Sequence, residues 1–118
     1  MDRQEHIEGL QINQLNPVDI DYFFRSLADR MPRRANDEQQ PLLDGLRQRI
    51  RDLALDLGNT KAKRLHADDT EGACALMVAQ IGQMRRRQWR DRIDGVKKID
   101  HVRAQVGEIS ADLRELTS

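Results

Sequence analysis

The chain has few of the residues that cross-link a small fold or fill a thick core, namely cysteines and aromatic residues. Among 118 residues there is one cysteine, so no disulfide can form within the chain, and we expect a reducing compartment. Aromatic residues make up only 3% of the sequence, namely one Trp, one Tyr and two Phe. So few large side chains predict helices joined along a narrow apolar seam rather than a thick globule.

Long apolar runs are also missing. The N-terminal residues are acidic and polar, without the apolar stretch of a secretory signal peptide. No segment approaches the roughly 20 consecutive apolar residues that a membrane-spanning helix needs. We therefore expect a cytoplasmic protein, or one that is exported without a cleavable signal peptide, and no membrane span.

A surplus of charge of one sign is absent as well. Lys+Arg and Asp+Glu each number 20, which gives a formal net charge of zero, and the mean hydropathy is −0.77. A protein that relies on bulk attraction to nucleic acid or anionic lipid is usually clearly basic. The balance argues against such a mechanism for the whole chain, but it leaves room for a local basic patch.

What the sequence does contain is helical periodicity, so we predict an all-α fold. Residues 1–15 lack this periodicity and are expected to form a flexible arm before a helical-hairpin or bundle domain over residues 16–118. Asn16 and Pro17 suit a helix start, and Pro32 ends that helix. One face of this first helix collects its apolar side chains: Ile20, Phe23, Phe24, Leu27 and Met31.

A second helix is expected from about residue 39 to 57, with Gly58-Asn59 as its C-cap, although residues 60–66 could equally continue it. Asp68 and Glu71 resemble a capping box that starts a third helix, which we expect to reach about Leu116. This long C-terminal helix would resemble a strand of a coiled coil, with a stutter or kink where its two apolar stripes lose phase between residues 84 and 89. Whether it is continuous is left open.

The length of that third helix is the main basis for a functional prediction. A helix of ~45 residues would be ~68 Å long, and the second helix is too short to cover it. Part of its apolar stripe must then meet a partner, another copy, or the first helix folded back.

Residue types that carry chemistry do not gather in the sequence. His6, His66 and His101 are isolated, whereas a metal site needs several converging ligands. Cys74 lies near a helix N-terminus, which could lower the pKa of its thiol, but a small buried hydrophobe is the favoured interpretation. No phosphate-binding loop or hydrolase motif occurs. We therefore predict no catalytic residue, metal or cofactor, and not an enzyme.

The one conspicuous cluster is basic. Residues 85–98 hold seven basic and two acidic side chains, a net of +5, whereas residues 1–24 carry a net of −4. Arginines on phosphates with Trp89 stacking on a base would give nucleic-acid binding. We favour a second interpretation over nucleic-acid binding, in which the arginines pair with acidic residues of a neighbouring helix or subunit. The predicted partner-binding residues are the apolar anchors Trp89, Ile93, Val96, Ile99 and Val102 and the basic side chains Arg85, Arg86, Arg90 and Arg92.

The order of these parts resembles a known family. A Phe-centred patch at residues 20–27 precedes the Leu42-Leu43 pair, and the break at residues 68–69 precedes Leu-Met-Val-Ala-Gln at 76–80. In this the chain resembles the inner-rod proteins of type III secretion, and second the needle proteins, which share a Val-Lys step like that at 96–97. The segment from 99 to 116 lacks the Lys- and Asn-containing ending of the rod family. The resemblance implies a subunit of a secretion-apparatus-like assembly.

Together these observations predict a non-enzymatic helical interaction protein that acts as a subunit or adaptor of a larger protein assembly, with self-association or a protein partner. The alternative is a nucleic-acid-binding protein that uses the Arg-rich helix over residues 84–98.

Overall fold

The computed structural model describes residues 17–84, 87–89, 91 and 99–117. Every regular element within these ranges is helical, so the all-α prediction is confirmed. The named elements are α2 (Pro17–Arg30), α3 (Gln40–Asp56), the 3-10 helix η1 (Thr60–Arg64), α4 (Thr70–Gln83) and α6 (Ile99–Thr117). The predicted arm over residues 1–15 lies outside the described residues.

The first two helices begin and end where the sequence signals predict. Pro17 opens α2, because a missing N–H costs nothing in a first turn, and the helix stops at Arg30, two residues before Pro32. After α3, Gly58 has a φ of 86°, a left-handed conformation that a side chain disfavours. The chain then forms η1 instead of continuing α3.

The start of α4 is displaced by one residue from its predicted position. Asp69, and not Asp68, is the N-cap, and its Oδ1 accepts a hydrogen bond of 2.8 Å from the backbone N–H of Gly72. The two neighbouring aspartates offer the same cap chemistry, so the sequence alone does not separate them.

The single long C-terminal helix is not what the structure shows. α4 ends at Gln83, and Met84 has an extended ψ of 138°. The helix from Ile99 to Thr117 is a separate element, 19 residues long. The break falls where the two apolar stripes lose phase in the sequence, so the expected kink is a full interruption.

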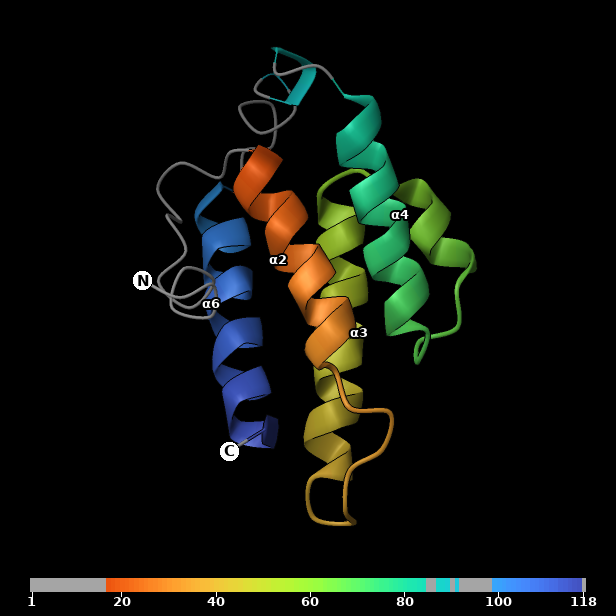
Figure 1. The fold of residues 1–118 in the computed structure, drawn as a ribbon, viewed down its shortest axis with the longest axis vertical. Coiled ribbons are helices and arrows are strands. Elements are labelled where there is room, and N and C mark those ends of the chain that lie inside the picture. The colour runs from red at the N-terminus through yellow and green to blue at the C-terminus, as the bar shows by residue number, and fades with distance from the viewer. Residues whose placement is uncertain (1–16, 85–86, 90, 92–98, 118) are drawn as a thin grey trace.

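Four helices form the body of the fold. In Figure 1, α2 and α6 run in one direction and α3 and α4 run in the other. α2 packs against α4, and α3 packs against both α4 and α6. Polar side chains also join α3 to α6: Arg49 Nη1 lies 2.5 Å from Asp112 Oδ2 and 3.8 Å from Glu108 Oε2, and His101 Nε2 lies 3.2 Å from Asp56 Oδ2.

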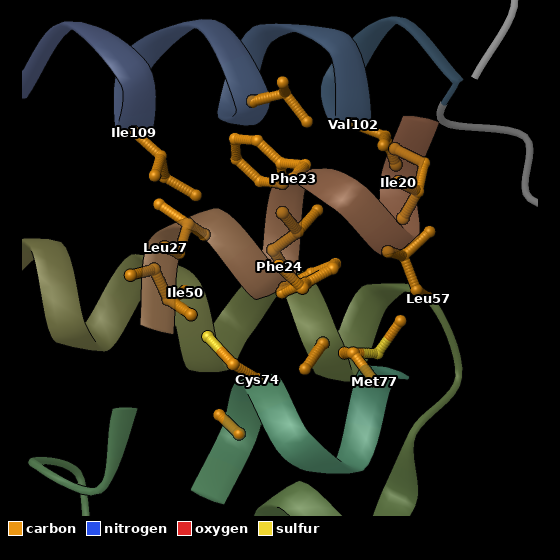
Figure 2. Close-up of a cluster of buried hydrophobic side chains, with 14 of the residues drawn as sticks. Ile20, Phe23, Phe24, Leu27, Ile50, Leu57, Cys74, Met77, Val102 and Ile109 are labelled. Carbon is orange, nitrogen blue, oxygen red and sulfur yellow. The ribbon is translucent and has the colours of Figure 1, made fainter. Parts of the chain in front are cut away.

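The core is one cluster to which all four helices contribute. Phe23 and Phe24 are fully buried on α2, with ring centroids 5.5 Å apart in an edge-on arrangement. Figure 2 shows the Phe23 side chain turned toward α6 and the Phe24 side chain turned toward α3 and α4. Adjacent aromatic residues of α2 thus reach two sides of the same core, while α3 is the helix that packs against both α4 and α6.

Candidate interaction surface

The apolar residues predicted as partner anchors belong to the protomer's own core wherever the structure describes them. Trp89 is 3% exposed and Val102 is 1% exposed. Further along the same stripe, Val106, Ile109 and Leu113 are buried as well. Side chains packed inside the protomer are not presented to a partner, so the structure gives the anchor role of Trp89 and Val102 no support, and it stays a prediction. Ile93, Val96 and the side chain of Ile99 lie outside the described residues.

This burial has a simple cause. Because the helix is interrupted after Gln83, α6 can fold back onto α3. The apolar stripe that the second predicted helix was too short to cover is therefore covered within the chain. In the described ranges, Val18 is the one large hydrophobic side chain that is exposed. The functional prediction from the sequence depended on an apolar stripe left uncovered by the chain itself. The described residues do not contain such an uncovered stripe.

Most of the basic cluster also lies outside the residues that the structure describes. Arg85, Arg86, Arg90 and Arg92 lie beyond it, while Arg87 is exposed. Because Trp89 is buried, it is not free to stack on a base, which removes one half of the nucleic-acid interpretation.

A different surface stands out on α4, which carries a single charged residue, Glu71, in a chain that is 34% charged. Apart from Glu71 in the first turn, its outward residues recur at helical spacing and are small or uncharged. Ala75, Ala79, Gly82 and Gln83 are exposed, and Gly72 and Leu76 are half-buried. We call these six residues the α4 outer face. At Ala75, Ala79 and Gly82 the small residues leave the helix backbone open to close approach by another helix, whereas at Gly72 the Asp69 carboxylate occupies that space.

Nothing inside the protomer explains why residue 82, on this face, is a glycine. A Cβ atom at that position would meet nothing within 4 Å, yet glycine within a helix costs about 1 kcal/mol relative to alanine. Gly45 and Gly107 have equally open surroundings, but they lie beside charged residues of α3 and α6. Only at Gly82, among these three, is the surrounding helix face uncharged.

A pocket of about 260 Å³ opens beside the α4 outer face, between α4 and the turn that leads into η1. Asn59, only 6% exposed, lines it, and its side chain makes no hydrogen bond among the described residues. Gln80 borders it, donates from Nε2 to the Leu57 carbonyl at 3.4 Å, and leaves its buried Oε1 without a partner. The remaining lining residues are Gly58, Thr60, Lys61, Leu76, Ala79 and Gln83. The buried Gln80 Oε1 is an acceptor with unused hydrogen-bonding capacity, which indicates a site for a donor from outside.

Charges of both signs surround the surface. Asp68, Asp69 and Glu71 are exposed at the N-terminal end of α4. Beside α4, η1 exposes its three basic side chains, Lys61, Lys63 and Arg64, and Lys61 lines the pocket. Arg51 holds η1 against α3, because its Nε donates to the Ala62 carbonyl at 3.2 Å and its Nη2 to the Lys63 carbonyl at 3.0 Å.

Cys74 lies on the inner side of α4, as the small buried hydrophobe that the sequence favoured. Burial first, and the charge of Glu71 second, raise the pKa of its thiol from the ordinary 9.0 to about 12. The helix N-terminus does not offset these two effects, so the thiol is protonated at neutral pH and is not an activated nucleophile.

The shifted thiol gives a pH-dependent prediction. Because the pKa is higher in the folded state, the neutral buried thiol contributes stability in full below pH 9, and this is lost as the pH rises from 9 through about 12. At pH 8 we expect the folded protein to react with a disulfide reagent roughly 100-fold or more slowly than the urea-unfolded chain. A native rate equal to the unfolded one would show that Cys74 is accessible.

Other site classes find less support. In the parts of the chain that the structure describes, no three His, Cys, Asp or Glu residues converge as metal ligands would. None of the helices described is at once long and apolar enough to span a membrane. Comparison with known proteins gives no match to any protein-family model, curated protein or solved structure.

Proposed function

We propose that the protein is a non-enzymatic helical interaction module that acts as a subunit or adaptor of a larger assembly, and that it makes contact through the α4 outer face. The observation that carries this proposal is the uncharged, small-residue face of α4 on an otherwise highly charged surface. Helix–helix interfaces need such faces, because charged side chains are depleted from the centre of protein contacts.

The neighbouring features support the same function. The pocket beside the face leaves the buried Gln80 Oε1 unpaired, which favours a partner that supplies a hydrogen-bond donor. Basic η1 on one side and acids on the other would orient that partner. The sequence resemblance to inner-rod and needle subunits also supports an assembly role, in a secretion-apparatus-like setting.

The proposal is tested by photocrosslinking in cells that produce the protein. A diazirine amino acid placed at Ala75 should yield covalent protein adducts, because Ala75 is exposed at the centre of the α4 outer face. The matched control is Ala104, an equally exposed alanine on the charged face of α6.

We expect adducts at position 75 and few at position 104. Equal yields at both positions, or no adduct at 75, would contradict the proposal. Should nucleic acid be the partner instead, the adducts would contain it, and binding would weaken steeply with added salt.

A further inference from the structure

The pocket beside the α4 outer face is bordered by a buried acceptor whose orientation is fixed. Gln80 Nε2 donates to the Leu57 carbonyl at 3.4 Å and lies 3.9 Å from Met84 Sδ, whereas the buried Oε1 has no hydrogen-bond partner. Turning the amide over would set Oε1 against the Leu57 carbonyl oxygen, which is also an acceptor. A buried acceptor without a donor destabilises the fold, so its presence beside a pocket favours a donor that arrives from outside.

The rest of the lining limits the charge and the size of the group that can enter. Lys61 is the one charged residue in this lining, and it disfavours a cationic donor. Asn59, 6% exposed, adds a second amide, which can donate as well as accept. At about 260 Å³ the pocket is smaller than the roughly 300–1,000 Å³ that is typical of sites for drug-sized ligands. The group that fits is small, neutral, and able both to donate and to accept.

We infer that this pocket binds a primary carboxamide, whose N–H donates to Gln80 Oε1 and whose carbonyl oxygen accepts from Lys61 or Asn59. A carboxylate lacks the N–H that Gln80 needs, and an amidinium brings a positive charge beside Lys61. The carboxamide is the smallest neutral group that carries its donor and its acceptor on separate atoms.

Two sources supply this chemistry, namely an asparagine or glutamine side chain of a partner protein and a small free amide. Leu76 and Ala79 belong both to the α4 outer face and to the pocket lining, so a partner on that face would reach the pocket. For this first source the inference rests on the proposed function, and it states the chemistry by which the partner is recognised.

Three probes of nearly the same shape test the chemistry: benzamide, benzoate and benzamidinium. Each is titrated into the purified full chain while the amide NMR signals are followed, including the side-chain NH₂ signals of Asn59 and Gln80. We expect saturable shifts of these signals with benzamide, and roughly tenfold weaker binding of the two charged probes. Equal binding of all three would overturn the inference. No binding of benzamide would do so as well, and would leave the pocket to water.

Gln80→Met tests the role of the acceptor. The variant keeps the length of the side chain and removes both amide atoms, so benzamide should bind roughly tenfold more weakly. The substitution removes one hydrogen bond to Leu57 together with the unpaired acceptor, so the urea midpoint should stay close to that of the wild type. Unchanged affinity for benzamide in a folded Gln80→Met protein would contradict the inference.

Lys61→Gln tests the charge selection independently of Gln80. Without the positive charge, benzamidinium should bind roughly tenfold more tightly, while benzamide should keep its affinity. Lys63→Gln is the matched control, because Lys63 is exposed on the same 3-10 helix but does not line the pocket. The same gain in both variants would show a general charge effect and not selection by the pocket.

Crosslinking separates the two sources of the amide. With a diazirine at Ala75, Gln80→Met should lower the yield of adducts roughly threefold when the amide belongs to the partner. An unchanged yield, in a chain that binds benzamide, would refute the partner as the source and assign the pocket to a small free amide. No adduct at Ala75 would refute the interaction surface of the proposed function, and benzamide binding would still establish the pocket.

Discussion

Replacing Phe24 with alanine is expected to lower the free energy of unfolding by about 3–5 kcal/mol. The Phe24 ring is fully buried and turned toward α3 and α4, so its removal leaves a cavity where three helices meet. Domains of this size are stable by only about 5–15 kcal/mol, so the loss takes a large share of the total.

Urea unfolding followed by far-UV circular dichroism measures this loss, and the midpoint should fall sharply. The matched control is Arg25→Ala on the same helix. Its guanidinium is largely exposed and, among the described residues, pairs only with Asp21 at 2.9 Å, so we expect a change of roughly 1 kcal/mol or less. If the two variants unfold at the same midpoint, the Phe24 ring does not fill the core as the structure places it.

Trp89→Ala is the second large effect, also about 3–5 kcal/mol for a buried indole. The change separates the two roles that Trp89 has been given. As a partner anchor it would be exposed, and its loss would weaken binding but not folding. The structure instead makes it 3% exposed and part of the core cluster, so its loss should destabilise the protomer itself.

Trp89 is the only tryptophan, so its fluorescence reports on this point in the wild-type protein. We expect emission at a short wavelength in the folded chain, with a red shift on unfolding. Arg87→Ala, at an exposed position two residues away, should change stability by about 0.5 kcal/mol or less. Emission already red-shifted in the folded state would place the indole in water and contradict the assigned burial.

Local signals in the sequence were enough to locate most helix ends. Pro17, Pro32 and Gly58 act through backbone geometry that is independent of the rest of the fold, so the limits of α2 and the end of α3 could be predicted. The cap of α4 was missed by one residue, because Asp68 and Asp69 are chemically equivalent and tertiary context chooses between them.

There is a physical reason why the sequence did not predict what the C-terminal apolar stripe packs against. Periodicity shows that Val102, Val106 and Ile109 share a face, but it does not show whether that face meets the same chain or another one. The loss of phase after Met84 indicated a break. How far the chain turns at the break depends on long-range packing, which a sequence pattern does not encode.

The α4 outer face was overlooked because apolar patterning draws attention to large side chains. Met77 and Ile81 mark the inner side of α4, while the outer side carries alanine and glycine, which hydrophobic periodicity ranks low. One signal was available in the sequence, namely the absence of charge between Glu71 and Arg85.

The central claim is that partners meet this protein on the α4 outer face. A photocrosslinking profile over four exposed alanines tests it most directly, with Ala75 and Ala79 on that face and Ala104 and Ala111 on α6. Our account predicts abundant adducts at the two α4 positions and background levels at the two α6 positions. Adducts concentrated on α6, or spread evenly over all four positions, would contradict it.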